Sequence, residues 1–328
     1  MKNKKRIAAL FAGAWALGIV SMMGGANSVC AAEDTEGFEI LYPEYMVESE
    51  GESLVLEKEP EKVICLSNSA LQILIRCDMQ PIAVTSPAST IDYPDWVSEL
   101  PVIETGMSEL DSESVIAMEP DLVIMGVHLQ EDYGPILESA GIPVYYTSEG
   151  PSITYNEVKL EALALGESFG GTEERDKIQQ EFDELEQRAA EYQESHDIKS
   201  MMILFAAPPS YQQTSEGYLG SMLSMLPFEN LSDTLIDPSA RTAPLDMEKL
   251  VEQNPEVLFA ISPTSPTAEV LQASYEEEFK NNPQIWDNLT AIQEGNIIYL
   301  SSDYVTSKGI HIIDSMNELM DMLEEKLQ

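Results

Sequence analysis

The sequence predicts an α/β protein with two Rossmann-like lobes, each on a parallel sheet, joined by one long interdomain helix. Short apolar strands alternate with amphipathic helices on both sides of a strandless interval, residues 154–195. That interval has helical periodicity, and a helix–turn–strand unit occurs twice, 135 residues apart at positions 110 and 245. Buried strands that alternate with helices are typical of βαβ-wound parallel sheets.

Residues 1–32 have the order of a secretory signal peptide. A basic start (Lys2, Lys4, Lys5, Arg6) precedes an apolar run over 7–20, and small residues follow. The run is shorter than the roughly 20 residues that span a bilayer, so we expect export to the periplasm or the extracellular face of the cell membrane. Cys30 is a candidate lipidation site, although Asn27-Ser28-Val29 before it departs from the usual lipoprotein pattern. Cleavage after Ala32 would instead remove Cys30, and both outcomes stay open.

The chain is strongly acidic, with 17 Lys and Arg against 58 Asp and Glu and a net charge of −41. Such a charge repels phosphate backbones, which excludes nucleic acid as a partner. With 44% apolar residues, the chain still has enough hydrophobic residues for a core. Cys65 and Cys77 lie in apolar contexts and are expected to be buried free thiols, because three cysteines give no disulfide framework or zinc spacing.

The first lobe is expected over residues 61–170, after an acidic extension with the first strands over 33–60. We expect the extension to be mobile over 33–52, with its first strand at 52–56. The apolar runs then predict strands at 63–66, 82–85, 122–125 and 144–146, and helices at 70–77, 112–118 and 133–139.

A linker helix is expected over residues 171–198, followed by a second lobe over 199–328. Apolar residues spaced by three and four form one face of the helix predicted at 173–194, and Gly170-Gly171 separates it from a helix at 158–169. The second lobe is predicted to have strands at 202–205, 257–261 and 297–300, and helices at 220–226, 247–253 and 310–327.

The repeated unit supports a duplicated architecture. Leu110-Asp111-Ser112-Glu113 aligns without a gap with Leu245-Asp246-Met247-Glu248, and a proline and an apolar strand follow each. We expect the aspartate to cap a short helix in both lobes. Either match alone could arise by chance between common units. A weaker second match, in the same order, pairs residues 141–145 with 295–299 and favours duplication.

In open parallel sheets, ligands bind beyond the carboxyl ends of the strands. The loops expected there contain hydroxyl, amide, imidazole and aromatic side chains, a lining that suits a bulky and partly apolar ligand. His128 and His311 are expected to face one opening from the two lobes, where imidazoles could ligate a metal centre, and Arg241 could pair with a ligand carboxylate. Ordinary surface roles are the competing interpretation of each. The candidate ligand-binding residues are Ser67, Asn68, Ser69, Tyr93, His128, Tyr211, Arg241, Tyr304 and His311. Motifs of common enzyme classes are absent from the sequence, so we expect no catalytic activity and no intrinsic cofactor or metal.

The ordered set of motifs resembles the substrate-binding proteins of iron-siderophore, haem and cobalamin ABC importers. It comprises Glu59–Ile64, Leu66–Ser69, Leu110–Ile124, Gly141–Val144, Leu165-Gly166, Pro255–Phe259, Trp286–Ala291 and Gly295–Tyr299. The resemblance implies a monomer that captures a metal chelate and hands it to a permease and its ATPase. It also implies that Glu113 and Glu248 dock on the permease, whereas the helix dipole alone is the other explanation for an acid there. The first loop departs from the family, with Ser69-Ala70 where Thr-Glu is usual.

Two other functions remain open. A binder of a bare transition-metal ion would use converging histidines and carboxylates, for which only His128 and His311 are available. A surface sensor or adhesion module would keep the fold without the transport role.

Overall fold

The computed structural model describes residues 37–88, 91–105, 109–148, 153–237, 240–265, 267–306 and 308–327. The predicted signal peptide and Cys30 lie outside these residues. Within the described ranges, no helix combines the length and the apolar character needed to cross a membrane.

The first strands form an antiparallel pair, β1 (Phe38–Leu41) with β2 (Ser53–Leu56). A 3-10 turn, η1 (Glu44–Met46), and a short helix, α1 (Val47–Glu50), connect them. The expectation of a mobile segment up to residue 52 is therefore wrong for this part of the chain. Its apolar side chains are held in the core, where the ring of Tyr42 stacks on Tyr145 at 4.4 Å.

The first lobe is built on a four-stranded parallel sheet of order β4-β3-β5-β6. Its strands are β3 (Val63–Leu66), β4 (Ala83–Val84), β5 (Leu122–Gly126) and β6 (Val144–Thr147). All four are buried, as their continuous apolar runs predict. Its helices are α2 (Asn68–Arg76), α3 (Ser112–Ala117) and α4 (Gln130–Ser139), with 3-10 turns η2 (Asp95–Glu99) and η3 (Val127–Leu129).

The second lobe is built on a six-stranded mixed sheet of order β10-β8-β7-β11-β12, with β9 also paired to β7. β7 (Lys199–Phe205) is parallel to β9 (Phe228–Asn230) and to β11 (Val257–Ile261), and β11 is parallel to β12 (Ile297–Leu300). The prediction of a parallel sheet fails at one side of this sheet, where β8 (Tyr211–Gln213) is antiparallel to both of its neighbours, β7 and the edge strand β10 (Thr242–Pro244). β8 follows β7 after a short connection and pairs back onto it, which only an antiparallel strand can do.

The second lobe also contains seven described helices, of which α8 and α12 are the longest. They are α6 (Tyr218–Leu223), α7 (Met247–Gln253), α8 (Ala268–Asn281), α9 (Pro283–Trp286), α10 (Thr290–Gln293), α11 (Asp303–Thr306) and α12 (Ile312–Lys326), with one 3-10 turn, η4 (Leu231–Thr234).

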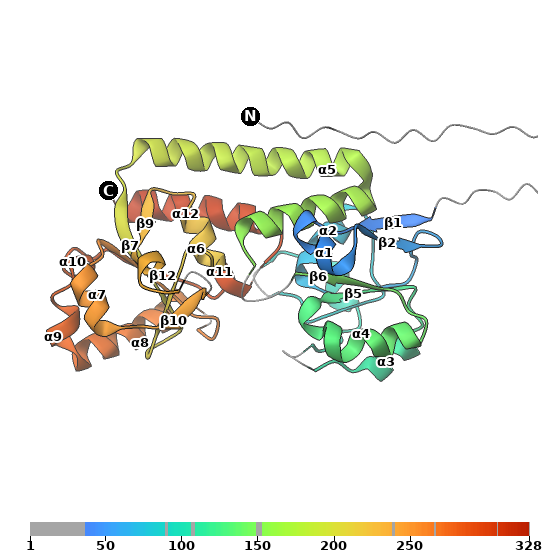
Figure 1. Cartoon of the computed structure of the whole chain (residues 1–328), viewed down its shortest axis with the longest axis horizontal. Helices are drawn as coiled ribbons and strands as arrows, with labels where there is room; N and C mark the ends of the chain where they lie inside the picture. The colour runs from blue at the N-terminus through green and yellow to red at the C-terminus, as the bar shows by residue number, and fades with distance from the viewer. Residues whose placement is uncertain are drawn as a thin grey trace, which may run out of the picture. The chain divides into compact units, whose positions relative to one another are not determined.

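The long helix α5 (Tyr155–Ser195) is a helical hairpin with two arms (Figure 1). Gly171 has φ 69° and ψ −175°, a backbone conformation that reverses the chain between residues 155–170 and 172–195. The arms lie antiparallel, because Lys159 Nζ lies 2.7 Å from Glu186 whereas Glu167, later on the first arm, lies 3.3 Å from Arg175, earlier on the second. The predicted helix over 173–194 is confirmed as the second arm, and the break falls at the predicted Gly170-Gly171.

The second arm of α5 joins the two lobes. From the first lobe, Arg76 of α2 bonds to Glu174 and Glu181 of this arm. Towards its other end, Arg188 bonds to Asn317 at 2.6 Å and to Asp321, both on α12 of the second lobe. The predicted interdomain helix is therefore present. The boundaries predicted at residues 61, 171 and 199 stay a prediction.

The repeat occupies equivalent positions in the two sheets. Asp111 caps α3 by accepting a bond from Ser114 N, and Asp246 caps α7 by accepting bonds from Glu248 N and Lys249 N. The strands that follow are β5, between β3 and β6, and β11, between β7 and β12. The matched sequences thus correspond to matched parts of a duplicated unit.

Candidate functional site

The loop after β3 forms a compact polar cluster at the carboxyl end of the first sheet. Ser67 is fully buried and caps α2, since its Oγ accepts a bond from Ala70 N at 3.1 Å. The Oγ atoms of Ser67 and Ser69 lie 3.0 Å apart. A helix that begins at the end of a buried strand holds these side chains in one orientation. We call Ser67, Asn68 and Ser69 the floor cluster.

Asn68 fixes the next loop against the floor cluster. Its Oδ1 accepts bonds from Tyr93 Oη at 3.2 Å and from Ala88 N at 3.3 Å, and its Nδ2 donates to Ser86 O at 3.2 Å. The structure therefore brings together two residues that the sequence predicted separately, Asn68 and Tyr93. One amide organises the carboxyl ends of β3 and β4.

A buried carboxylate, Glu161, lies beneath the floor cluster and was missed by the sequence analysis. It is on the first arm of α5, only 2% exposed, and accepts bonds from Ser69 Oγ and from Ser148 N, each at 2.8 Å. Ser148 follows β6, so Glu161 links the ends of β3 and β6. The signal was present in the sequence, because Glu161 shares the buried helix face of Val158, Ala162 and Leu165.

The charge of Glu161 affects nearby phenols. Burial raises the pKa of Tyr45 well above its usual range, and the carboxylate of Glu161 raises it further. The same two causes, in the same order, raise the pKa of Tyr145. Both phenols therefore stay neutral hydrogen-bonding groups at neutral pH.

The second lobe places two predicted tyrosines differently. Tyr211 begins β8 opposite Phe205, the last residue of β7, and is 46% exposed. Tyr304 lies in α11, after β12, and is only 6% exposed. Burial, followed by the charge of Glu318, raises the pKa of the Tyr304 phenol. The loop between β7 and β8 is held by Tyr275 of α8. Its Oη lies 2.6 Å from Ser210 Oγ and donates a hydrogen bond to Ala206 O.

His311 and Tyr93 line one pocket of about 220 Å³, to which both lobes contribute. Its Nδ1 is 3.3 Å from Asp314 Oδ2, an ion pair when the imidazole is protonated. The pocket is lined by Gln72, Ile75, Arg76, Ile91, Asp92, Tyr93, Pro94, Glu181, Ile310, His311, Ile313 and Asp314. Two candidate ligand-binding residues from opposite lobes are thus neighbours.

The other candidates lie apart from this pocket, whose lining does not include His128, Tyr211, Arg241 or Tyr304. His128 is exposed in η3, directly after β5. The carbonyl of Arg241 accepts a bond from Thr214 N, just after β8. The last residue of β8, Gln213, pairs with Ile203, so Arg241 lies level with the middle of β7 and not with its carboxyl end. A cleft shared by His128, Tyr211, Tyr304 and the floor cluster stays a prediction.

The matched acids of the repeat are both exposed. Glu113 lies in the first turn of α3, and Glu248 in the first turn of α7. Neither is covered by the rest of the described chain. In the parts of the chain that the structure describes, no group of three or more His, Cys, Asp or Glu side chains is arranged to hold a metal ion.

The two α/β lobes and the polar cluster at the strand ends define the class of bilobal binding proteins. The sequence model of the family described as periplasmic binding protein matches residues 63–304, about three quarters of the chain. The chain belongs to this family, and it is a substrate-binding protein of the kind that serves ABC transporters. The family consists of binding proteins and not of enzymes.

Relatives and solved structures agree with this assignment. The ABC transporter substrate-binding lipoprotein YvrC of Bacillus subtilis is 20% identical over 326 residues, which cover 95% of this chain and 96% of YvrC. A cobalamin-binding protein of Halobacterium salinarum is 21% identical over 266 residues, covering 80% and 69%. An ABC transporter substrate-binding protein from Listeria monocytogenes has the same fold, with a TM-score of 0.67 at 20% identity, and the match covers 81% of this chain and 98% of that one.

Proposed function

We propose that this protein captures a metal chelate (a ferric siderophore, haem or a corrinoid) between its lobes and delivers it to an ABC importer. The observation that carries the proposal is the Asn68–Tyr93 pair, because it places an amide and a phenol from rigid elements at the strand ends, above the buried hydroxyls of Ser67 and Ser69. A bulky chelate needs such a mixed polar and aromatic surface. The cobalamin-binding relative supports the same ligand class.

The further parts of the proposal concern the ligand site and partners. We keep Ser67, Asn68, Ser69, Tyr93 and His311 as ligand-binding residues of one cleft. His128, Tyr211, Arg241 and Tyr304 are proposed to face the same ligand from the surrounding loops. The protein acts as an exported monomer without an intrinsic cofactor or catalytic activity, with a lipid anchor if Cys30 is retained. Its partners are the permease and the ATPase.

The docking role of Glu113 and Glu248 is part of this proposal. Each is an exposed acid at the start of a helix next to the carboxyl end of a sheet. The helix dipole favours an acid there, but the same register in both lobes also suits two contacts with one permease.

Thermal-shift measurements test the ligand class. The full chain is mixed with haem, with cobalamin and with a panel of ferric siderophores, and Zn²⁺ and Mn²⁺ serve as the arm for bare metal ions. A ligand that binds the native state raises the melting temperature by mass action. We expect one chelate class to raise it and the bare ions to leave it unchanged. A rise with Zn²⁺ or Mn²⁺ alone would favour the bare-metal function and contradict the proposal.

A further inference from the structure

The side chain of Gln72 connects the two lobes directly. It lies on α2, one turn after the floor cluster, and is only 7% exposed. Its Nε2 donates to Lys308 O at 2.7 Å, and its Oε1 accepts from His311 N at 2.9 Å. Lys308 and His311 precede α12 in the second lobe. One amide therefore uses both its donor and its acceptor to bind the backbone of the other lobe.

The same amide also contacts the floor cluster. Gln72 Nε2 donates to Asn68 O at 2.9 Å, and Asn68 is the residue whose side chain holds Tyr93. The bonds made by Gln72 thus run from a candidate ligand-binding residue to segment 308–311. A Glu side chain of the same shape lacks the donor for Lys308 O and Asn68 O, and a Met side chain has no donor and only a weak acceptor in its sulfur.

Gly309 brings the backbone of segment 308–311 against α2. Its φ is +102°, and a Cβ at this position would lie 2.8 Å from Ser69 Cα and 2.7 Å from Gln72 Nε2. Such distances leave no space for a side chain. At this point the backbone of the second lobe therefore contacts Ser69 of the floor cluster. Gly309 makes the close approach possible, and the hydrogen bonds of the Gln72 amide hold it.

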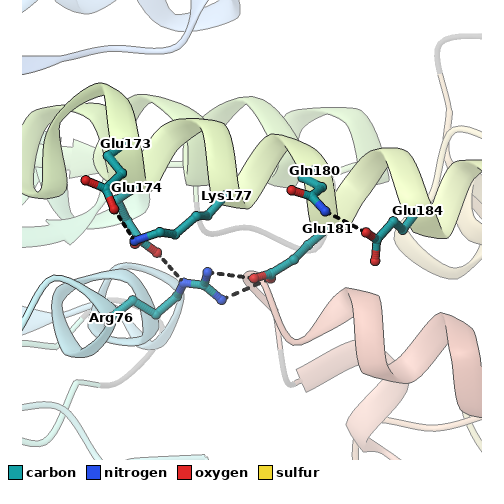
Figure 2. A network of polar contacts seen from close by, with 7 residues as sticks. All are labelled: Arg76, Glu173, Glu174, Lys177, Gln180, Glu181 and Glu184. Carbon is teal, nitrogen blue, oxygen red and sulfur yellow. Dashed lines mark hydrogen bonds and ion pairs between the residues drawn. The ribbon is translucent and has the colours of Figure 1, made fainter.

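A second tie on α2 lies one turn beyond Gln72. Figure 2 shows Arg76 between two carboxylates of the second arm of α5, those of Glu174 and Glu181. Arg76 Nε donates to Glu174 Oε1 at 2.9 Å, and its Nη2 donates to Glu181 Oε1 at 2.8 Å. Lys177 lies beside them, 3.0 Å from Glu173. Since Arg188 of the same arm holds α12 at Asn317, the path from α2 through α5 leads to α12, the helix that directly follows segment 308–311. The bonds of Gln72 to segment 308–311 connect α2 to this same region directly, so the two lobes are joined both through α5 and through Gln72.

We infer that Gln72 is a positioning residue of the ligand cleft: its amide latches α2 to segment 308–311 and so sets the spacing between the strand-end loops of the two lobes. The inference rests on the proposed function for its ligand, but the latch itself is a property of the free protein. A long helix alone fixes the distance between its own ends. It leaves the lobes free to rock about those ends, and the latch removes that freedom.

The test is a distance measurement between the lobes. Spin labels are attached through unnatural keto amino acids at the exposed positions Glu131 on α4 and Gln272 on α8, so that the native cysteines are kept. Pulsed electron resonance on the free wild type should give one narrow distance distribution. Gln72→Met should broaden it and shift it to longer distances, and Gln72→Glu should do so less.

Gln212→Met is the matched control, because Gln212 is also a buried glutamine but lies within the second lobe. It should leave the distribution unchanged even if it lowers stability, which separates a positioning role from a structural one. Gly309→Ala is a second route to the same effect, since its Cβ would press on Ser69 without removing the amide. A wild-type distribution in both Gln72→Met and Gly309→Ala would overturn the inference.

Chelate binding gives the functional readout. We expect Gln72→Met to weaken binding of the chelate found by thermal shift by at least about tenfold, because the open state must close before the ligand contacts both lobes. Equal affinity in wild type and Gln72→Met would overturn the positioning role. A wild type that binds none of the chelates would instead overturn the proposed function, while the distance measurement still decides whether the latch exists.

Discussion

Glu161 shows how one buried residue organises the candidate site. Its carboxylate holds Ser69 and Ser148, so the loops after β3 and β6 depend on a side chain from the first arm of α5. The fold places this acid in the core because its hydrogen bonds compensate for the loss of water.

Replacement of Glu161 tests this role. Glu161→Ala removes the carboxylate that accepts bonds from the Ser69 hydroxyl and the Ser148 N–H, so we expect the free energy of unfolding to fall by about 2–4 kcal/mol. Glu161→Gln keeps one acceptor oxygen and should cost about half as much. Urea denaturation of the three proteins measures the difference. Equal losses for Ala and Gln would show that the carboxylate oxygens are not what supports the loops.

Cys77 gives a prediction about pH. Burial, followed by the nearby Glu174 carboxylate, raises the pKa of the Cys77 thiol to about 11. A raised pKa means that the thiol is protonated at neutral pH, and only the thiolate reacts with alkylating agents. The rate of iodoacetamide labelling at Cys77, followed by peptide mass mapping, should rise about tenfold per pH unit from pH 7 to about 11. A plateau near pH 9 would contradict the raised pKa.

That Asn68 and Tyr93 lie close together could be predicted, because both follow strand ends of a parallel sheet, and their role in ligand binding stays a prediction. Glu161 and Gln72 could not be predicted in this way. Glu161 shares a helix face with apolar residues, but in a chain with 58 acidic residues one Glu in a helix resembles a surface residue until that face is known to be buried. The partners of Gln72 lie 236 and 239 residues away, beyond any local pattern.

Among the elements, the reversal in α5 depends on Gly171. Its combination of φ 69° and ψ −175° is a conformation that residues with a Cβ rarely adopt. The two arms can fold back on each other only if this residue takes it. The sequence indicated the break, since two consecutive glycines interrupt the helical pattern, but it did not indicate that the arms pack side by side.

We therefore expect Gly171→Ala to lower the free energy of unfolding by about 1–3 kcal/mol. Gln193→Ala, an exposed change on the second arm, serves as the control and should stay within about 0.5 kcal/mol of the wild type. Chemical denaturation monitored by circular dichroism measures both. If the two variants are equally stable, the strain at the reversal is not localised at Gly171.

The strands differ in how well their sequences predict them. β3, β11 and β12 were predicted with the observed bounds, because each is an unbroken apolar run. β8 and β10 were missed, since Tyr-Gln-Gln and Thr-Ala-Pro become strands through pairing with each other and with β7. The helix α8 was missed because only Leu271 and Tyr275 of its 14 residues are buried.

At the scale of the whole molecule, the duplicated unit makes the docking proposal testable. The double variant Glu113→Arg/Glu248→Arg should keep chelate affinity and should abolish stimulation of the cognate transporter's ATPase, because like charges would face each other at both contacts. Glu131→Arg/Glu269→Arg is the matched control, with both acids in the first turns of other helices. Normal stimulation by the folded first variant would leave only the helix-dipole explanation for these acids.

The measurement that tests the central claim most directly is a calorimetric titration of the chelate panel into the wild type and into Asn68→Ala. The account predicts that one chelate class binds with a stoichiometry of one. It also predicts that Asn68→Ala weakens this binding by at least about tenfold, because Asn68 orients Tyr93 and the loop after β4. Unchanged affinity in a folded Asn68→Ala protein, or no heat of binding with any chelate, would contradict it.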